Sequence, residues 1–308
     1  MIEVSVIVTF HNEKALARTT LTAIGRMRRD AADHGIVSEL VAVLDCADPE
    51  TRAVVLAHPE LSSQARAIEV SHRDPGLSRN AGVSNAAGAI LVMLDGDNYY
   101  SSNWLERSFH YIRKWGNDVI LHPATKMIFG DDRYTIVRQH DQESDHYDPA
   151  GWLVHNFWDT CSAASRKIYE RCPYQPTQVA LTGFGYEDWH WNCETVASGY
   201  KHKVIDDAFM LYRRKKDGMC EQHNTLSAII RPTALFQPDR AGSQLLTGRS
   251  RDTRLRRFAG AGREFARSCQ AHLFTMLQVS ESSLIPRLPG FLRQAMEPMV
   301  RRARALFF

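Results

Sequence analysis

The sequence predicts an α/β protein whose mixed, mostly parallel β-sheet is flanked by helices. Short apolar, β-branched segments alternate with segments of helical apolar spacing over about the first hundred residues. Such alternation implies parallel strands joined by right-handed crossover connections. The 308 residues, 44% of them apolar, are enough for a sizeable core, so we expect one large domain with at most a smaller second unit.

Each expected element follows from its local pattern. The expected strands are 4–10, 39–44, 67–70 and 90–94. The helices expected after the first three strands are 16–27, 50–57 and 77–87. Residues 117–173 are expected to supply the strands that complete the sheet. Within that segment, the polar, turn-rich stretch 130–151 is consistent with a mobile loop.

The fourth strand ends in two carboxylates, Asp95 and Asp97, separated only by Gly96. Open α/β sheets place their ligands at the carboxyl ends of strands. Two such acids can hold Mn²⁺ or Mg²⁺, whose remaining coordination positions accept substrate phosphates. A solvated turn is the alternative, because Asp, Gly and Asn at 95–98 are good turn formers.

Composition narrows the class of protein. The chain has no run of about 18 uncharged apolar residues and begins directly with a strand-like segment, so we expect neither a spanning helix nor a signal peptide. A cytoplasmic location is therefore expected. The six cysteines include no C-x-x-C pair, which argues against a zinc ribbon or redox motif. We expect them to be reduced and mostly buried.

Charge is distributed unevenly along the chain. Residues 249–308 contain twelve arginines and four acidic residues, a net +8, which leaves −5 for the first 248 residues of a chain carrying +3. A basic tail on an acidic body suggests contact with lipid headgroups or nucleic acid, and solvated helices are the alternative. Helices are expected at about 251–279 and 290–306. The second has the composition of an interfacial helix, although it could equally dock on protein.

Four stretches occur in an order and at a spacing typical of one family. They are VSVIVTFHNE, VAVLDCADPET, DPGLSRNAGVSNAAGAILVMLDGD and GFGYEDWHWNCETVASGY. Over residues 1 to about 215 the chain resembles inverting family-two glycosyltransferases of the bacterial surface-polysaccharide type. The resemblance implies the Rossmann-like GT-A fold over residues 1–230. The nucleotide-sugar half would be about 1–100 and the acceptor half about 101–230, followed by a basic helical extension, 231–308.

The resemblance also implies roles for residues on the donor side. Asp97 would bind the metal directly, and Asp95 would contact the ribose or reach the metal through water. The nucleotide base would be contacted by Phe10, Asn12 and Glu13 after the first strand and by Asp45 at the end of the second.

Two further donor-side residues lie near the predicted third helix. Arg79 lies in the GLSRNAG segment at a helix start, where its guanidinium and the backbone N–H groups could bind phosphate. An ordinary surface arginine is the alternative. Asp74 has a weaker claim, similar to that of Asp45, and both acids could instead form turns or cap helices.

The acceptor hydroxyl must lose its proton, which requires a carboxylate opposite the leaving diphosphate. Glu187 and Asp188 are candidates, and as adjacent residues they point in different directions and should have different roles. The resemblance assigns the base to Asp188 and leaves Glu187 to hold the acceptor or orient the loop. The alternative is two acids that simply favour the first turn of a helix. The nearby Phe157, Trp158, Trp189 and Trp191 could floor an acceptor site or pack a core.

The chain departs from the family pattern in LYRRKKDGMCEQHN. A histidine after the Tyr-Arg pair often completes the metal site in the family, whereas Lys215 stands near that place here. His223 could serve as the third metal ligand, or it could be a solvated loop residue. Lys215 or Arg213 could alternatively contact the diphosphate directly.

These features predict a metal-dependent enzyme that transfers a sugar, with inversion, from a nucleotide sugar to a hydroxyl of a glycan or lipid-linked acceptor. A UDP-sugar is the first expectation for the donor. The alternatives are retention or sugar-phosphate transfer on the same fold, or a non-catalytic partner in polysaccharide assembly. We expect peripheral contact with the inner face of the cell membrane through the basic extension, and no nucleic acid partner.

Overall fold

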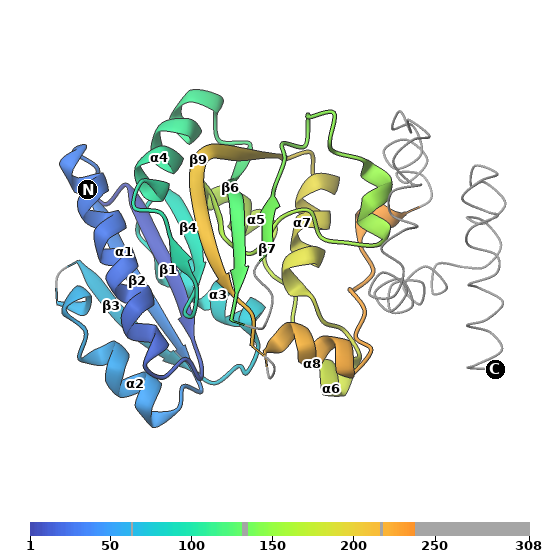
Figure 1. Ribbon diagram of the computed structural model, residues 1–308. Coiled ribbons are helices and arrows are strands. Elements are labelled where there is room, and N and C mark those ends of the chain that lie inside the picture. The colour runs from blue at the N-terminus through green and yellow to red at the C-terminus, as the bar shows by residue number, and fades with distance from the viewer. Residues whose placement is uncertain (63, 131–134, 216–217, 238–308) are drawn as a thin grey trace, which may run out of the picture.

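The computed structural model describes residues 1–62, 64–130, 135–215 and 218–237 (Figure 1). Within these ranges nine strands form one sheet with the spatial order β3-β2-β1-β4-β8-β6-β9-β5, and β7 pairs with β6. The strands are β1 (Val4–Phe10), β2 (Ser38–Asp45), β3 (Ala65–Val70), β4 (Ile90–Asp95), β5 (Tyr99–Tyr100), β6 (Val119–Phe129), β7 (Thr135–Arg138), β8 (Ser162–Ser165) and β9 (Lys201–Arg213).

Helices alternate with the strands as the sequence predicts. They are α1 (Leu16–Asp33), α2 (Pro49–Leu56), α3 (Pro75–Asn85), α4 (Trp104–Trp115), α5 (Arg166–Arg171), α6 (Val179–Thr182), α7 (Glu187–Ala197) and α8 (Met219–Thr225), with short 3₁₀ helices η1 (Pro59–Leu61), η2 (Pro149–Leu153) and η3 (Ala234–Phe236). The four strands expected in the first hundred residues are all present. Helix α1 extends six residues beyond the expected end at Met27, and its buried Ala31 continues the apolar face.

Strand pairing confirms a mixed, mostly parallel sheet. β1 pairs in parallel with β2 and β4, β2 with β3, and β6 with β9. Strand β8 lies antiparallel between β4 and β6, and β5 and β7 are antiparallel to their neighbours. The parallel strands therefore present their carboxyl ends at one edge of the sheet, where ligands bind in open α/β folds.

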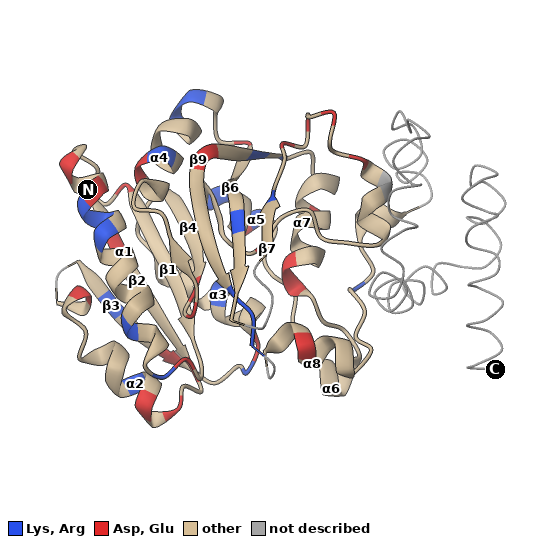
Figure 2. Ribbon diagram, viewed as in Figure 1, with Lys and Arg blue, Asp and Glu red and all other residues tan. Residues whose placement is uncertain are grey.

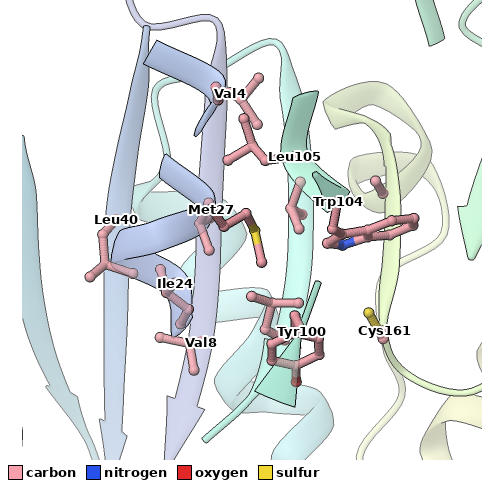
Figure 3. Packing of buried hydrophobic residues seen from close by; sticks show 14 of the residues in the cluster. Val4, Val8, Ile24, Met27, Leu40, Tyr100, Trp104, Leu105 and Cys161 are labelled. Carbon is pink, nitrogen blue, oxygen red and sulfur yellow. The ribbon is translucent and has the colours of Figure 1, made fainter. Parts of the chain in front are cut away.

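Each face of the sheet is covered by its own helices. Helices α1 and α4 pack on one face through residues such as Leu21, Ile24 and Phe109. Figure 3 shows Ile24 and Met27 of α1 against Val8 and Leu40, with Trp104 and Leu105 of α4 nearby. Helices α3, α5 and α7 cover the opposite face, and strands buried on both sides read as continuous apolar runs, which is why the sequence revealed them.

A third apolar cluster, beside α7, contains aromatic residues that could either line an acceptor site or pack a core. Trp158 and Trp189 are buried in it together with Trp152. Trp191 faces the other way and stacks on Tyr169 and on Tyr174, with ring centroids 5.1 Å apart in each pair. Of the two alternatives given for these three tryptophans, packing in a core is therefore the one that the structure shows.

The stretch 130–151 is not simply a loop, because residues 135–138 form β7 and pair with β6. Among the described cysteines, Cys161, Cys172 and Cys193 are buried thiols and Cys46 is partly buried, but Cys220 is exposed.

The expected helices at 251–279 and 290–306 lie outside the described residues, so the division at residue 231 stays a prediction. No helix in the described part of the chain has the length and apolar character needed to cross a membrane.

The two-residue strand β5 positions one part of the site. Tyr99 and Tyr100 pair antiparallel with Leu211 and Met210 at the end of β9. Continuing this register past the strand ends brings residues 213–215 alongside residues 95–97. The backbone N–H of Arg213 donates to Asn98 Oδ1 at 2.9 Å, which fixes that alignment.

Candidate active site

The predicted site residues gather at the carboxyl edge of the sheet and at the start of α7. Figure 2 shows the acidic first turn of α7 and the basic segment that follows β9 toward the same end of the molecule. β4 ends at Asp95, and α7 begins at Glu187. Both acids therefore lie in the first turn of a helix, a position that fits the structural alternative as well as a catalytic role.

Arg79 links these two elements. Its Nη1 donates to Glu187 Oε1 at 2.7 Å and its Nη2 to Asp95 Oδ1 at 3.0 Å. The side chain is 4% exposed and its guanidinium lies 5.3 Å from the centre of the Tyr174 ring. Burial opposes the charge, but Asp95 and Glu187 outweigh it and raise the pKa of Arg79. Arg79 is therefore a buried, doubly paired cation rather than a surface arginine.

Asp45 organises the loop that leads into α3. One of its carboxylate oxygens accepts from the N–H groups of His72 and Arg73, and the other from Asp74 N–H and Ser78 Oγ, at 2.7 to 3.0 Å. Burial favours the protonated acid, but these hydrogen bonds outweigh it and lower the pKa of Asp45. Four donors fill the acceptor positions of a carboxylate. In this structure Asp45 shapes the loop, and contact with the nucleotide base stays a prediction.

Asp74 caps α3 and ties it to a distant segment. Its Oδ1 accepts from Leu77 N–H at 2.9 Å, as an N-cap residue does. Its Oδ2 accepts from the backbone and hydroxyl of Thr177 at 2.6 and 2.9 Å. The capping alternative therefore describes Asp74, and the capped α3 presents Arg79 to Glu187.

The Asp-Gly-Asp turn depends on the absence of a side chain at its centre. A Cβ on Gly96 would lie 2.6 Å from the carbonyl oxygen of Thr9 and 2.4 Å from a ring carbon of the buried Phe10. The ring of Phe10 thus packs directly against the turn at Gly96. Asp97 Oδ2 lies 2.6 Å from the Lys215 ammonium.

The loop after β1 approaches the same charges. The N–H of His11 donates to Glu13 Oε2 at 2.5 Å. Burial raises the pKa of Glu13, the His11 N–H opposes that shift, and the charge of Asp97 adds to it. Glu13 is therefore close enough to Asp97 for the charge of Asp97 to affect its pKa. Asn12, by contrast, is exposed.

Asp188 has different surroundings from its neighbour Glu187. Its Oδ2 accepts from Asn156 Nδ2 at 3.1 Å and its Oδ1 from Trp189 N–H at 2.8 Å. Burial, and then the charge of Glu187, raise the pKa of Asp188 to about 7. The two adjacent acids thus point to different partners, as the sequence analysis expected.

Sequence analysis missed the residues that hold Asp188. Asn156 is itself held by Asn192, whose amide donates to Asn156 Oδ1 at 2.9 Å and to the Trp158 carbonyl at 2.8 Å. Asn192 lies four residues after Asp188 on α7, on the same helix face, and that spacing was a usable signal. Nothing local marked Asn156.

The structure does not bring His223 to the strand-end acids. His223 is 5% exposed on α8, and its Nδ1 accepts from Tyr186 N–H at 3.2 Å. Burial lowers the pKa of His223. His223 is therefore neither a solvated loop residue nor a neighbour of Asp97.

In the described residues, Asp97 is paired with a cationic side chain, Lys215, rather than grouped with further metal ligands. Within the described ranges, no three His, Cys, Asp or Glu side chains gather as ligands for a metal ion. Asp95 Oδ1 is bonded to Arg79, and Asp97 Oδ2 is paired with Lys215. Oxygen ligands dominate Mg²⁺ sites, whereas an ammonium group has only donors.

Comparison with known proteins identifies the family. Residues 5–172, more than half of the chain, match the model described as glycosyl transferase family 2. This chain belongs to that family. Family 2 membership confirms the family resemblance noted in the sequence.

Individual relatives of this family 2 chain are more distant. The succinoglycan biosynthesis protein ExoO of Rhizobium meliloti (strain 1021) is 33% identical over 86 residues, which span 28% of this chain and about a quarter (24%) of ExoO. Staphylococcus aureus TarS 1–349, solved with UDP-GlcNAc, is 12% identical with a TM-score of 0.56, covering 98% of this chain and 79% of TarS. GalNAc-T7, solved with UDP, GalNAc and Mn²⁺, is 15% identical with a TM-score of 0.53, covering 71% and 45%. The solved structures confirm the GT-A fold.

Arg79→Met should strongly destabilise the protein. The change leaves the buried Glu187 and the partly buried Asp95 without their shared cation, a loss that costs about 3–5 kcal/mol for a buried pair. Urea denaturation monitored by circular dichroism measures it. The control is Arg52→Met, whose exposed pair with Glu69 should be worth less than about 1 kcal/mol. Equal losses in the two variants would contradict the role of Arg79.

Gly96→Ala should displace the Asp-Gly-Asp turn. The added Cβ meets a backbone carbonyl that cannot rotate away, so we expect a loss of about 1–3 kcal/mol of unfolding free energy. The displaced turn would also move Asp97 away from Lys215, and we expect the affinity of the variant for UDP to fall as a result. Urea denaturation and calorimetric titration with UDP test both effects. Wild-type values in both would show that the turn tolerates a side chain.

Proposed function

We propose that this chain transfers a sugar from a nucleotide sugar to an acceptor hydroxyl with inversion, using Asp188 as the general base. The observation that carries the proposal is the environment of Asp188. It is a partly exposed carboxylate, held by Asn156, with a pKa raised to about 7. A base is most effective when its pKa lies near the working pH.

The donor is proposed to lie at the carboxyl edge of the sheet, between the loop after β1 and the Asp-Gly-Asp turn. TarS has been solved with UDP-GlcNAc and with UDP, and GalNAc-T7 with UDP, which supports a UDP-sugar here. Both terminal nitrogens of Arg79 are bonded to acids. We therefore assign Arg79 to positioning Asp95 and Glu187 rather than to binding phosphate.

The reaction is a single displacement. The acceptor oxygen forms a bond to the anomeric carbon while that carbon's bond to the diphosphate oxygen breaks, and the electron pair leaves with the nucleoside diphosphate. The proton of the acceptor hydroxyl passes to Asp188. Glu187 is paired with Arg79 at 2.7 Å, which disfavours it as a nucleophile for a double displacement. Inversion is therefore favoured over the retaining alternative.

The acceptor is proposed to be a glycan or lipid-linked sugar in polysaccharide assembly. The short match to ExoO, a succinoglycan biosynthesis protein, supports this class. The catalytic arrangement around Asp188 argues against a non-catalytic partner. Dependence on Mn²⁺ or Mg²⁺ stays a prediction of the sequence, and no step of this mechanism is routed through a metal.

Asp188→Asn should lower kcat by roughly 10² to 10⁴ and leave UDP affinity unchanged, because the amide cannot accept the proton. Product formation from a labelled UDP-sugar gives kcat, and calorimetric titration gives affinity. Asn156→Ala is the companion variant. It should lower kcat less, because it removes only a hydrogen bond that orients the base. Unchanged turnover in Asp188→Asn would rule out this base.

The pH dependence of both activity and stability should report the pKa of Asp188. Activity requires the ionised form, so kcat/KM should fall about tenfold per pH unit below about 7. The folded-state pKa is raised above the usual value, so stability present at low pH is lost as pH rises through about 7. Asp188→Asn should therefore melt higher than wild type at pH 8 and equally at pH 4. Identical melting curves at pH 8 would contradict the raised pKa.

The basic segment 249–308 is proposed to hold the enzyme at an anionic membrane that carries the acceptor. Its net +8 is known from the sequence, and each Lys or Arg near such a surface contributes on the order of 1 kcal/mol. Co-sedimentation of the full chain with anionic vesicles should weaken at high salt and after Arg301, Arg302 and Arg304 are changed to Gln. Binding that is insensitive to vesicle charge would assign the segment to protein contacts.

A further inference from the structure

We propose that the Lys215 ammonium takes the place of a divalent metal ion at Asp97 and binds the donor diphosphate, so that nucleotide binding and transfer proceed without metal. The inference rests on the proposed function, because it concerns the same donor site. It goes beyond the family assignment, which names no group that stabilises the leaving diphosphate.

The first observation is the contact itself. Lys215 Nζ lies 2.6 Å from Asp97 Oδ2, with the two side chains 32% and 15% exposed. Asp97 is the acid that the family resemblance assigns to direct metal binding. Lys215 is thus a cation held at that carboxylate and still reached by solvent, as a group that binds a phosphate must be.

The second observation is that the fold places Lys215 there. β5 pairs with the end of β9, and Arg213 N–H is fixed to Asn98 Oδ1 at 2.9 Å. Lys215, two residues after the end of β9, therefore lies beside Asp97 of the Asp-Gly-Asp turn.

The third observation concerns the other residues that were expected to bind a metal ion, His223 and Asp95. His223, on α8, is buried and accepts from the backbone N–H of Tyr186, and Asp95 Oδ1 accepts from Arg79. In the part of the chain that the structure describes, no three metal-ligating side chains come together. The Lys215 ammonium is therefore the cation that the described residues place at Asp97.

The chemistry suits an ammonium group. Lysine carries three N–H donors, so one amine can contact a carboxylate and a phosphate oxygen together. As the bond from the anomeric carbon to the diphosphate breaks, negative charge grows on the leaving oxygen, and a fixed cation stabilises it. The sequence has four basic residues in succession at 213–216, which adds positive charge on this segment. Arg213 itself is held by the Tyr99 hydroxyl at 3.1 Å and lies over the Phe129 ring, so Lys215 is the residue we assign to phosphate.

The test uses the full-length protein and calorimetric titration with UDP, GDP and dTDP, in EDTA and again with Mn²⁺. Wild type should bind its nucleotide in EDTA with a Kd within about threefold of that measured with Mn²⁺. Lys215→Met should weaken binding at least tenfold in EDTA. The control Arg214→Met removes the adjacent, exposed cation and should bind within about twofold of wild type.

Lys215→His is the converse variant, because it restores a side chain that can bind metal. It should bind weakly in EDTA and at least tenfold more tightly with Mn²⁺. Wild-type binding that appears only with Mn²⁺, or a Lys215→Met variant with wild-type affinity, would overturn this inference alone. Failure of the wild type to bind any of the nucleotides in either condition would overturn the proposed function as well.

Discussion

The buried guanidinium of Arg79 is the interaction on which the site depends. A buried cation is costly unless its partners are present with good geometry, and here Glu187 and Asp95 supply them from two different elements. Helix α3 must therefore be in place before the end of β4 and the start of α7 can be held together. Asp45 and Asp74 hold α3 in place by bonding the loop in front of it.

The same ion pair separates the roles of two adjacent acids. Glu187 is paired with Arg79, whereas burial, and then the charge of Glu187, raise the pKa of Asp188. Among the described residues, Asp188 accepts from an amide and a backbone N–H, and the charge of Arg79 opposes the rise in its pKa without reversing it. The two adjacent acids therefore have different surroundings, which supports the different roles proposed for them.

The sequence predicted what local patterns determine and missed what distant pairing determines. The first four strands were readable because each is a buried apolar run, and the Asp-Gly-Asp turn because it ends one of them. Arg79 and Glu187 are 108 positions apart, so only the fold could pair them. The approach of Lys215 to Asp97 depends on β5, whose two residues are too short to leave a periodic pattern. Asn156 lay in a stretch with no signal, although Asn192 was spaced to share a helix face with Asp188.

The number of hydrogen bonds that each predicted acid accepts indicates whether it builds the fold or serves the chemistry. Asp45 accepts four and Asp74 three, so their carboxylates are largely saturated by the loop they organise. Asp188 accepts two, which leaves acceptor capacity for a proton. Asp97 is held by a flexible lysine rather than by backbone. A saturated carboxylate must break bonds to engage a ligand, which supports the proposal that Asp188 and the Asp97–Lys215 pair carry the chemistry.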